Sequence, residues 1–370
     1  MAERRAVRLL EIPRPGVARL VDDEEAAPAD GQFRVETLYS GLSAGTELTY
    51  FKGTNPLLHG AWDPGLGVLR HDRPARGFPV RAPGYMEVGR VCETRTAAVA
   101  AGELVALAYG HKTGHTVDPA RDRFFVLPAG LDPLLGVYVA QMGPICANGL
   151  LHAAADVAGP GAVELGDGVR GRHVLVTGAG VIGLLVGLFA RHLGAAEVLV
   201  ADATPRRLRA AEGLGLGAVD DADGAAWRVV KERWRRDPSD CGADVVFQCR
   251  GRSAALAAAL RSLRPQGTVI DLAFYQGGAG DLALGEEFHH NGLSIRCAQI
   301  ARVPRGLAHL WDRRRLAAET VDLLAAHGPA VREHLVTDVV PLAEAPELLA
   351  DLAARRRHVI QAVFTCGQDA

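Results

Sequence analysis

Long apolar runs are missing from this sequence of 370 residues. No apolar segment reaches the about 18 residues that a membrane-spanning helix requires. The N-terminal stretch is broken by Pro13, Arg14 and Pro15, so it lacks the pattern of a secretion signal. An excess of one charge is missing too: 41 Lys and Arg oppose 43 Asp and Glu, a formal net charge of −2, which disfavours binding to nucleic acid or another polyanion. We therefore expect a cytoplasmic protein without a nucleic-acid or membrane partner.

Cysteine is also scarce, and no C-x-x-C pair of the kind used for structural zinc or thiol redox chemistry is present. Aromatic residues make up only 5%, whereas 48% hydrophobic and 23% charged residues are ordinary for a soluble globular protein. This composition excludes a disordered chain, and the length predicts two domains. The six cysteines, which we expect to be reduced, are Cys92, Cys146, Cys241, Cys249, Cys297 and Cys366.

The segment 4–125 has the pattern of a β-rich domain. Short apolar stretches at 33–39, 88–93 and 103–108 are separated by Gly and Pro, which favours a small barrel with long loops. The longest of these loops spans 54–81 and is rich in Gly, Pro, His and Arg. It either borders a cleft or is a solvated excursion of the surface, and the sequence leaves both readings open.

The pattern changes after residue 134, where 135–155 repeat apolar residues at helical spacing, as expected of helices that link two domains. Strands and helices then alternate, which predicts a parallel, doubly wound α/β sheet with right-handed crossovers. The expected strands are 173–177, 197–201, 244–248 and 268–273, and the expected helices are 181–193, 205–214 and 253–263. Beyond them we expect helices at 316–326 and 342–355 and a strand at 359–365 that returns to the first domain.

The strongest motif is VLVTGAGVIG at 174–183, in which a buried strand runs into G-x-G-x-x-G and then directly into a helix. Gly178 permits the tight turn, Gly180 lets the backbone approach a pyrophosphate, and Gly183 lets the helix pack closely on the strand. The helix N-terminus, with Val181 and Ile182, then faces the negative phosphates. The motif therefore predicts a dinucleotide-binding site.

Asp202 closes the next strand, 19 residues after Gly183. A carboxylate at this place accepts hydrogen bonds from both ribose hydroxyls of NAD and repels the 2′-phosphate of NADP, so Asp202 predicts NAD. Arg206 and Arg207 follow closely; they either clamp a 2′-phosphate or are solvated residues of the next helix. Arg207 is therefore a candidate cofactor residue, and NADP is the alternative cofactor.

Three further motifs accompany the glycine loop: YSGLSAGTEL at 39–48, PGYMEVGRV at 83–91 and DVVFQCRG at 244–251. The glycine loop comes late in the chain, after a β-rich half and before a short returning segment. With these motifs in this order, the sequence resembles the medium-chain dehydrogenase/reductase superfamily over nearly its whole length.

The resemblance implies an α/β protein with two domains and an active site in the cleft between them. A GroES-like β-barrel catalytic domain is expected from 1–141 and from a returning part, 303–370. A Rossmann nucleotide-binding domain with a doubly wound parallel sheet, 142–302, is expected between these parts. The resemblance also implies a homodimer formed through the nucleotide-binding sheet, with 293–300 as its edge.

The zinc ligands of this superfamily are missing from the matching positions. Zinc-dependent members have a Cys in a C-G-T-D type motif, where 42–47 here reads LSAGTE, and G-H-E where His and Glu are replaced by Tyr85 and Met86. The third ligand falls near 141–144, QMGP, and 109–118 lacks the cysteines of the structural zinc lobe. Because zinc requires thiolate, imidazole or carboxylate ligands, the sequence predicts a zinc-free member.

Without zinc, another group must stabilise the substrate oxygen while hydride moves. Tyr85 stands where the family has its ligand His; it either donates a hydrogen bond to that oxygen or merely fills the space of the metal. Thr46 matches the Thr or Ser of the family's proton relay, and Glu47 is either a member of this site or a structural partner. A metal site rebuilt with loose geometry is the remaining alternative, from His111, His115 and Cys146.

Further candidate residues follow from family segments. His111, a general acid or base near neutral pH, and Lys112, a group for an anionic or hydroxylated substrate, follow the strand at 103–108, where the family's substrate pocket begins. Both are equally read as polar residues of an exposed loop. The family segments that contact the cofactor contain Cys249, Gly251, Ala273, Phe274 and Gln299.

These features predict a zinc-independent, NAD-dependent oxidoreductase that interconverts an alcohol and a ketone. Its expected substrate is a small polar metabolite, such as a sugar, cyclitol or polyol, of bacterial biosynthesis. The alternatives are an NADPH-dependent enoyl reductase, since zinc-free relatives often reduce carbon–carbon double bonds, and a redox-neutral enzyme that oxidises its substrate transiently with retained NAD. A protein that binds NAD without turnover is the alternative from a different class.

Overall fold

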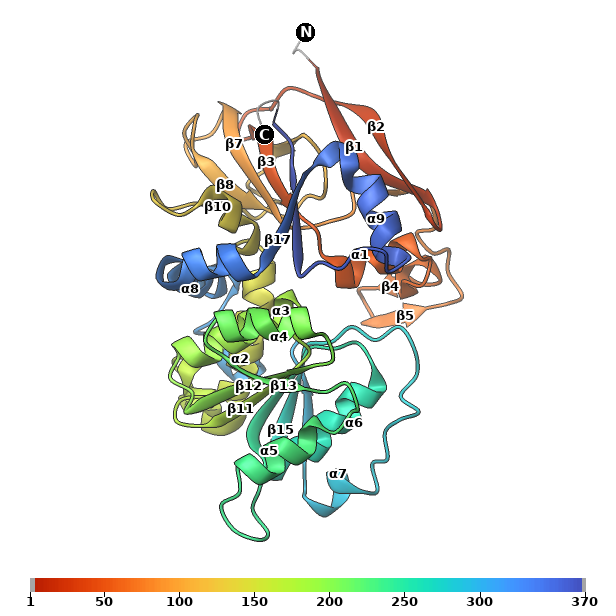
Figure 1. The fold of residues 1–370 in the computed structure, drawn as a ribbon. Helices are drawn as coiled ribbons and strands as arrows, with labels where there is room; N and C mark the ends of the chain where they lie inside the picture. The colour runs from red at the N-terminus through yellow and green to blue at the C-terminus, as the bar shows by residue number, and fades with distance from the viewer. Residues whose placement is uncertain (1–3, 368–370) are drawn as a thin grey trace. The chain divides into compact units, whose positions relative to one another are not determined.

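The computed structural model describes residues 4–367, which form two compact units (Figure 1). Unit 1 contains both ends of the chain, up to Gln141 and from Val336, and unit 2 is the continuous segment Met142–Leu335. The second boundary corrects the expected return at residue 303, because helix α8 (Arg313–His334) belongs to unit 2. Its side chains pack on helix α2 (Met142–Ala158), and this contact keeps the segment with the nucleotide-binding half.

The contact between α2 and α8 is close. A Cβ added to Gly143 of α2 would lie 2.1 Å from the side chain of Thr320 on α8. The helix α8 also continues through Pro329, well past the expected end at residue 326. Buried Leu323 and Val331, one before and one after this proline, explain why packing overrides the usual tendency of proline to end a helix.

The larger sheet of unit 1 has the strand order β10-β8-β7-β3-β18-β17, and β9 also pairs with β3. Strand β18, near the C-terminus, pairs antiparallel with β3, so the last strand returns to the N-terminal half of the chain as expected. Phe33, Val91 and Val105 belong to the fully buried core of this sheet. The bounds are β3 (Phe33–Gly41), β7 (Glu87–Thr94), β8 (Leu104–Leu107), β9 (Gly114–Val117), β10 (Phe125–Val126), β17 (Val336–Pro341) and β18 (Gln361–Thr365).

A second sheet of unit 1 has the order β2-β1-β6. Apolar residues of β1, including Leu10 and Ile12, pack with Phe51 of α1 and Leu349 of α9 in one core. This packing holds α1, which carries residues of the motif at 39–48, in a fixed place. The bounds are β1 (Arg5–Arg14), β2 (Val17–Glu25), β6 (Val80–Arg81), α1 (Ala44–Phe51) and α9 (Ala345–Ala353).

The long loop expected at 54–81 has ordered structure of its own. It contains a short hairpin of β4 (Ala61–Asp63) and β5 (Val68–Arg70) before it reaches β6. Asp63 accepts a hydrogen bond from the Gly65 amide at 3.0 Å, and its carboxylate lies 3.5 Å from Arg73. The hairpin is thus stabilised by its own turn and ion pairs.

Unit 2 contains a parallel sheet with the order β13-β12-β11-β14-β15-β16. This is the doubly wound order in which the direction of strand addition reverses between β11 and β14. The α/β class expected from the sequence is confirmed. The bounds are β11 (His173–Thr177), β12 (Glu197–Asp202), β13 (Gly217–Asp220), β14 (Ala243–Gln248), β15 (Leu263–Asp271) and β16 (Ser294–Cys297).

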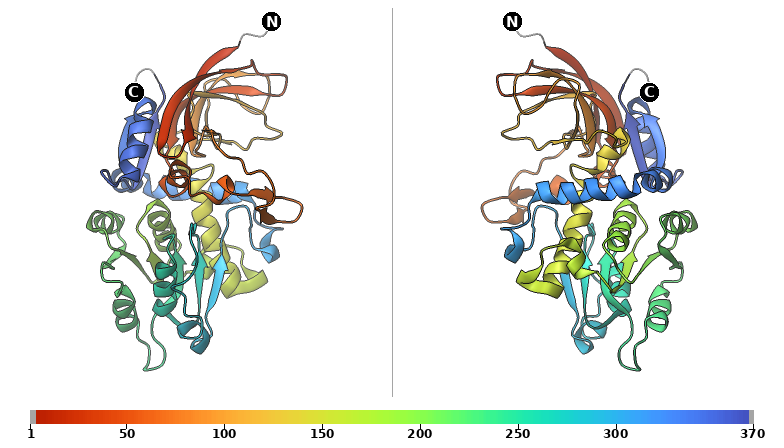
Figure 2. Two further views of the ribbon diagram at one scale, coloured as in Figure 1. Left: turned by 90° about the vertical axis from the view of Figure 1, so that its right-hand side faces the viewer. Right: turned by 90° about the vertical axis from the view of Figure 1, so that its left-hand side faces the viewer.

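Helices cover both faces of this sheet, as Figure 2 shows. Helices α5 and α6 bury one face through a core that includes Trp234, Val246 and Leu260. Helices α2 and α3 pack on each other, α2 also on β15 and α3 on β11 and β12. The bounds are α3 (Val181–His192), α4 (Pro205–Gly213), α5 (Ala226–Arg233), α6 (Ser253–Ser262) and α7 (Glu287–His290). Among the described residues, no helix combines the length and the apolar character needed to cross a bilayer.

Candidate active site and cofactor site

The loops that follow the parallel strands of unit 2 come together at one edge of the sheet. The Cys249 amide after β14 donates to the Thr177 carbonyl of β11, and the Gly178 amide after β11 donates to the Ala201 carbonyl of β12. A Cβ on Gly178 would lie 3.2 Å from the Cβ of Arg250. Ligands of such sheets bind at the carboxyl ends of the strands where the strand order reverses. The predicted cofactor residues therefore lie on adjacent loops.

The glycine loop has the backbone that its predicted role requires. Gly178 has a φ of +98°, and a Cβ on Gly183 would lie 1.8 Å from the Gly178 carbonyl oxygen, so only glycine permits this packing of α3 on the loop. A Cβ on Gly180 would meet no atom within 4 Å. Gly180 is also the N-cap of α3 and caps it with no side chain, which suits the binding of a phosphate to the first-turn amides of Val181 and Ile182. These residues fit a dinucleotide.

Asp202 lies at the end of β12 and is almost fully buried. One carboxylate oxygen accepts from the Ala179 amide at 2.9 Å and the other from the Thr204 amide at 2.8 Å. The guanidinium of Arg207 lies 3.8 Å from the same carboxylate. A carboxylate has further lone pairs, so Asp202 both fixes the glycine loop and keeps capacity to accept ribose hydroxyls.

The remaining predicted cofactor residues lie on the loops after β14, β15 and β16. A Cβ on Gly251 would lie 2.5 Å from the carbonyl oxygen of Phe274, so these two loops touch. The Ala273 amide donates to Asp271 at 3.0 Å, and the Gln299 side chain accepts from the Ala301 amide at 2.7 Å. Their backbones are thus fixed at the edge where a dinucleotide binds in this fold.

Cys249, on the loop after β14, is not suited to reactive-thiolate chemistry. Burial raises the pKa of its thiol well above the ordinary value. The residue therefore contributes backbone and packing to the cofactor site.

Sequence reasoning missed two residues of α2 that fix the loop after β16. The Asn148 amide nitrogen donates to the Gln299 carbonyl at 3.0 Å, and a ring nitrogen of His152 lies 2.9 Å from the Arg302 carbonyl. Their spacing of four residues places both on one face of the helix. The only sequence signal was a pair of polar residues inside an otherwise apolar helical face.

Three hydroxyl groups of unit 1 form a cluster in the segments that the sequence resemblance matches to zinc ligands. The Tyr85 hydroxyl is in hydrogen-bond contact with the Ser43 hydroxyl and lies 3.4 Å from the Thr46 hydroxyl. Tyr85 and Thr46 are partly exposed, so a substrate can reach them, whereas Ser43 is buried. The sequence predicted Tyr85 and Thr46 but missed Ser43. The signal for Ser43 was a serine at the N-cap position of α1.

His111 does not have the exposed acid–base role expected from the sequence. It is fully enclosed, with an exposed fraction of 0%. Its Nε2 lies 2.6 Å from Glu47 and its Nδ1 lies 2.6 Å from the Ser40 hydroxyl. Both ring nitrogens are therefore occupied inside the protein, and His111 and Glu47 are partners of each other.

The charges around His111 decide its pKa and that of Glu87. Burial by itself lowers the pKa of His111, but the charge and hydrogen bond of Glu47 and the charge of Glu87 outweigh it, so the pKa lies above the ordinary value. Burial raises the pKa of Glu87, and the His111 charge, two backbone amides and Ser40 only partly offset this effect. The site favours a protonated imidazole between two carboxyl groups.

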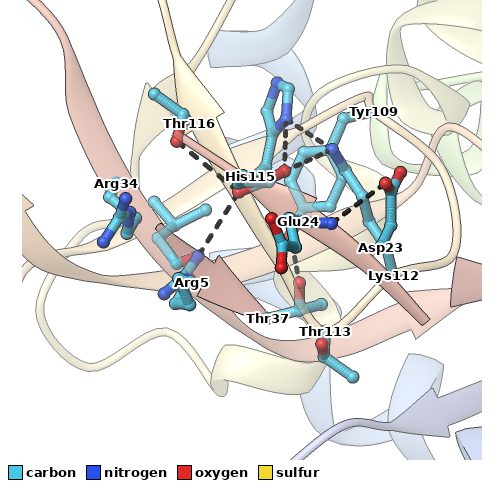
Figure 3. Close-up of polar contacts among 12 residues, drawn as sticks. Arg5, Asp23, Glu24, Arg34, Thr37, Tyr109, Lys112, Thr113, His115 and Thr116 are labelled. Carbon is cyan, nitrogen blue, oxygen red and sulfur yellow. Dashed lines mark hydrogen bonds and ion pairs between the residues drawn. The ribbon is translucent and has the colours of Figure 1, made fainter. Parts of the chain in front are cut away.

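Lys112, expected to bind substrate, is part of a different ion-pair cluster. Its ammonium lies 2.9 Å from Glu25 and 2.7 Å from His115, and Figure 3 shows the Lys112 and His115 side chains converging beside the ring of Tyr109. Lys112 and Glu25 are each mostly buried in this contact. The structure therefore places Lys112 in a contact that joins strands of unit 1, and the expected substrate contact stays a prediction.

The residues at the family's zinc positions do not fit a zinc ion. Hydroxyl groups of Ser43, Thr46 and Tyr85 replace the thiolate and imidazole ligands that zinc prefers. The nearby imidazole and carboxylate bind each other. Within the part of the chain that the structure describes, no group of three or more His, Cys, Asp or Glu residues is arranged to hold a metal ion. His111 and His115, the basis of the alternative metal site, face different carboxylates.

Comparisons with known proteins agree with this architecture. Residues 181–303 match the family described as zinc-binding dehydrogenase. A D-guloside 3-dehydrogenase of Shigella flexneri shares 27% identity over 346 residues, which covers 90% of this chain and 92% of the relative. A protein of the same name from Escherichia coli K12 shares the same identity and coverage.

Solved structures extend the likeness to the whole fold. A dehydrogenase from Sinorhizobium meliloti 1021 bound to NADP aligns with a TM-score of 0.71 at 19% identity, covering 98% of this chain and 99% of the other. An alcohol dehydrogenase from Escherichia coli CFT073 complexed with NADH aligns with a TM-score of 0.70 at 16% identity, covering 97% and 99%. With the glycine loop, the reversal point of the sheet and the near full-length relatives, these findings show an NAD(P)-dependent dehydrogenase with the fold of the medium-chain dehydrogenase/reductase superfamily.

Proposed function

We propose that this dehydrogenase interconverts an alcohol and a ketone on a sugar-like substrate, with NAD as its cofactor and without a catalytic zinc ion. The observation that carries the proposal is the contact of the Tyr85 hydroxyl with Ser43 and Thr46, at the position where zinc-dependent relatives have metal ligands. Hydrogen-bond donors aimed at the substrate oxygen perform the task for which other members use the metal.

Tyr85 acts on the substrate oxygen. Bound NAD or NADH supplies the hydride chemistry at carbon. In reduction, Tyr85 donates its hydroxyl proton as the carbonyl oxygen gains negative charge, and Thr46 returns a proton to the Tyr85 oxygen. In oxidation the steps reverse, so Tyr85 passes its own proton to Thr46 as it receives the proton of the alcohol. The Ser43 and Tyr85 hydroxyls are in contact, and when Ser43 donates to the Tyr85 oxygen the Tyr85 proton is free to point at the substrate. Thr46, which is partly exposed, exchanges that proton with solvent.

The proposed substrate class rests on the hydroxyl groups of the site and on the relative that aligns over nearly its whole length. Hydroxyl groups such as those of Ser43, Thr46 and Tyr85 recognise the donors and acceptors of a polyhydroxylated molecule. The similarity to D-guloside 3-dehydrogenase supports a sugar or sugar derivative whose secondary alcohol is oxidised. NAD is preferred over NADP because the carboxylate of Asp202 opposes a 2′-phosphate.

Substitution of Tyr85 tests this proposal. We expect Tyr85→Phe to lower kcat by about a hundredfold, the size of a general acid–base contribution, while the affinity for NADH stays the same. The measurement is steady-state turnover on a panel of sugars, polyols, ketones and enones with both cofactors, together with NADH binding by fluorescence. Thr46→Val, which keeps the volume of the side chain, should lower kcat less.

Other outcomes of the same panel would contradict the proposal. Full activity of Tyr85→Phe would remove Tyr85 from the reaction. Turnover of enones alone, with NADPH, would indicate an enoyl reductase. Cofactor binding without turnover of any substrate would indicate a protein that binds NAD without catalysis.

A further inference from the structure

Four buried polar side chains near Tyr85 are joined in a row by hydrogen bonds. Ser40, Glu47, Glu87 and His111 each have an exposed fraction of 1% or less. His111 joins Glu47 through Nε2 and Ser40 through Nδ1, each at 2.6 Å, and the Ser40 hydroxyl donates to Glu87 at 3.1 Å. The network spans α1, β3, β7 and the loop after β8, so it connects the segments that build the active-site wall of unit 1.

The hydrogen bonds determine where the protons lie. Ser40 has one hydroxyl proton and donates it to Glu87. Its contact with His111 therefore requires the Nδ1–H of the imidazole to donate, and the Nε2–H donates to Glu47 in turn. This pattern fits a doubly protonated imidazole that contacts Glu47 directly and Glu87 through Ser40.

This network reaches the pair of Ser43 and Tyr85 hydroxyls through the backbone of Ser43. The second oxygen of Glu47 accepts a hydrogen bond from the Ser43 amide at 2.7 Å. Ser43 is the residue whose hydroxyl contacts Tyr85. Because His111 holds the Glu47 carboxylate, the position of Ser43 depends on His111.

The network also contacts Tyr85 from the backbone side. The His111 amide donates to the Pro83 carbonyl at 2.8 Å. A Cβ on Gly84 would lie 2.9 Å from the His111 ring, so the imidazole packs directly on the backbone before Tyr85. Gly84 has a φ of +111°, a conformation that favours glycine and permits this approach. His111 therefore supports both partners of the hydroxyl pair.

Stability alone does not account for such a network. Replacing a buried ion pair by apolar side chains of similar volume is often neutral or stabilising, and Phe364 already packs edge-on against the His111 ring. A charged network instead fixes the orientation of its side chains, because each of its hydrogen bonds has one donor and one acceptor.

We propose that Glu47 and His111 are positioning residues that hold the Ser43 and Tyr85 hydroxyls in contact. The proposal rests on the function proposed for Tyr85 and adds the part of the protein that orients it. Glu47 and His111 do not touch the substrate. They act through Ser43 and Gly84, and their loss misaligns the Tyr85 hydroxyl.

A double-mutant cycle tests this proposal. We expect His111→Gln to lower kcat about tenfold to a hundredfold, the cost of a misplacement near 1 Å, without changing the KM for NAD. In a Tyr85→Phe background the same substitution should produce no further loss, because the group that it positions is already gone. Losses that multiply in the double variant would overturn the proposal.

Conservative and control variants separate positioning from general damage. Glu47→Gln keeps an oxygen for the Ser43 amide and should retain most of the activity that Glu47→Ala loses; equal losses would contradict the proposal. His115→Gln is the matched control, since His115 also lies between two carboxylates of unit 1, Glu25 and Asp122, and packs on the Tyr109 ring. It should leave kcat within about twofold. Thermal melting checks the folding of every variant.

A readout independent of activity completes the test. A crystal structure of His111→Gln should show the Ser43 and Tyr85 hydroxyls apart, and an intact contact would overturn the proposal. If His111→Gln does not fold, the crystal structure of Glu47→Ala decides the question, because the two hydroxyls should lie apart in that variant as well. Full activity of Tyr85→Phe would instead contradict the proposed function, so the two failures are distinct.

Discussion

Asp202 links the cofactor preference to the shape of the glycine loop. Its carboxylate accepts from the amides of Ala179 and Thr204 and lies near Arg207. A single side chain therefore holds the turn between β11 and α3 and, in the proposed function, opposes the 2′-phosphate of NADP. The preference for one cofactor and the geometry of the loop change together when this residue is replaced.

Removal of this carboxylate should weaken discrimination between the cofactors. We expect Asp202→Ala to reduce the preference of kcat/KM for NAD over NADP by about tenfold, equivalent to about 1.4 kcal/mol, because repulsion of the 2′-phosphate is lost. Steady-state kinetics with each cofactor measures the ratio. Asp223→Ala, which removes an exposed carboxylate from the same unit, should leave the ratio unchanged, and an unchanged ratio in Asp202→Ala would refute the assignment.

The contacts of His111 also depend on its surroundings in the fold. Its sequence position, after a strand and before Lys112, is equally typical of an exposed loop and of a substrate pocket. Burial and the two acidic partners Glu47 and Glu87 come from segments far apart in the chain. No local pattern shows that these groups meet, so the sequence pointed to the residue but could not indicate its burial or its contact with Glu47.

At the scale of elements, an ion-pair cluster joins β2 to β9. Glu25 at the end of β2 contacts Lys112 and His115, and Arg5 of β1 lies 3.6 Å from it. Burial raises the pKa of Glu25, but the hydrogen bonds and charges of His115 and Lys112 outweigh it and lower the pKa to about 2. The folded protein therefore binds a proton at Glu25 less readily than the unfolded chain does.

This cluster predicts a stability contribution that is lost in acid. The ordinary pKa of the carboxyl is 4.5 and the folded value is about 2, so the contribution is complete above about pH 4.5 and disappears as the pH falls toward 2. We expect Glu25→Gln to lower Tm by about 2–4 °C at pH 7, the shift for about 1 kcal/mol in a unit of this size, and by less as the pH falls. Melting curves from pH 7 to 3 measure this. The exposed neighbour Glu24, changed to Gln, should have little effect, and a Tm difference for Glu25→Gln that does not shrink in acid would contradict the assignment.

Helices and strands with a clear apolar periodicity lie where the sequence predicts them, whereas features that depend on packing could not be predicted from the sequence. The strand before the glycine loop and the helix after it, α3, lie where their apolar pattern predicts. The length of α8 did not follow, because the continuation past Pro329 depends on burial against other helices of unit 2. Strand β16 was expected only as an apolar edge, and its pairing with β15 is a tertiary contact.

At the scale of the whole molecule, the main chemical expectation is activity without a bound metal. The hydroxyl groups at the metal positions and the mutual pairing of His111 and Glu47 leave zinc without suitable ligands. We expect elemental analysis of the active enzyme to find less than stoichiometric zinc, and we expect kcat to be unchanged within about twofold after dialysis against a chelator. One zinc per chain, with activity lost on chelation and restored by zinc, would refute the proposal. The homodimer implied by the family resemblance stays a prediction.

The sequence by itself determined the fold class and the dinucleotide loop, because each depends on patterns of residues close together in the chain. The spacing of Gly178, Gly180 and Gly183 is a local requirement of one turn and one helix. The tertiary structure alone decided the unit to which α8 belongs, the partner of Ser43 and the burial of His111. These depend on contacts between distant segments, and the energy of a buried charge is set by the groups that surround it in space.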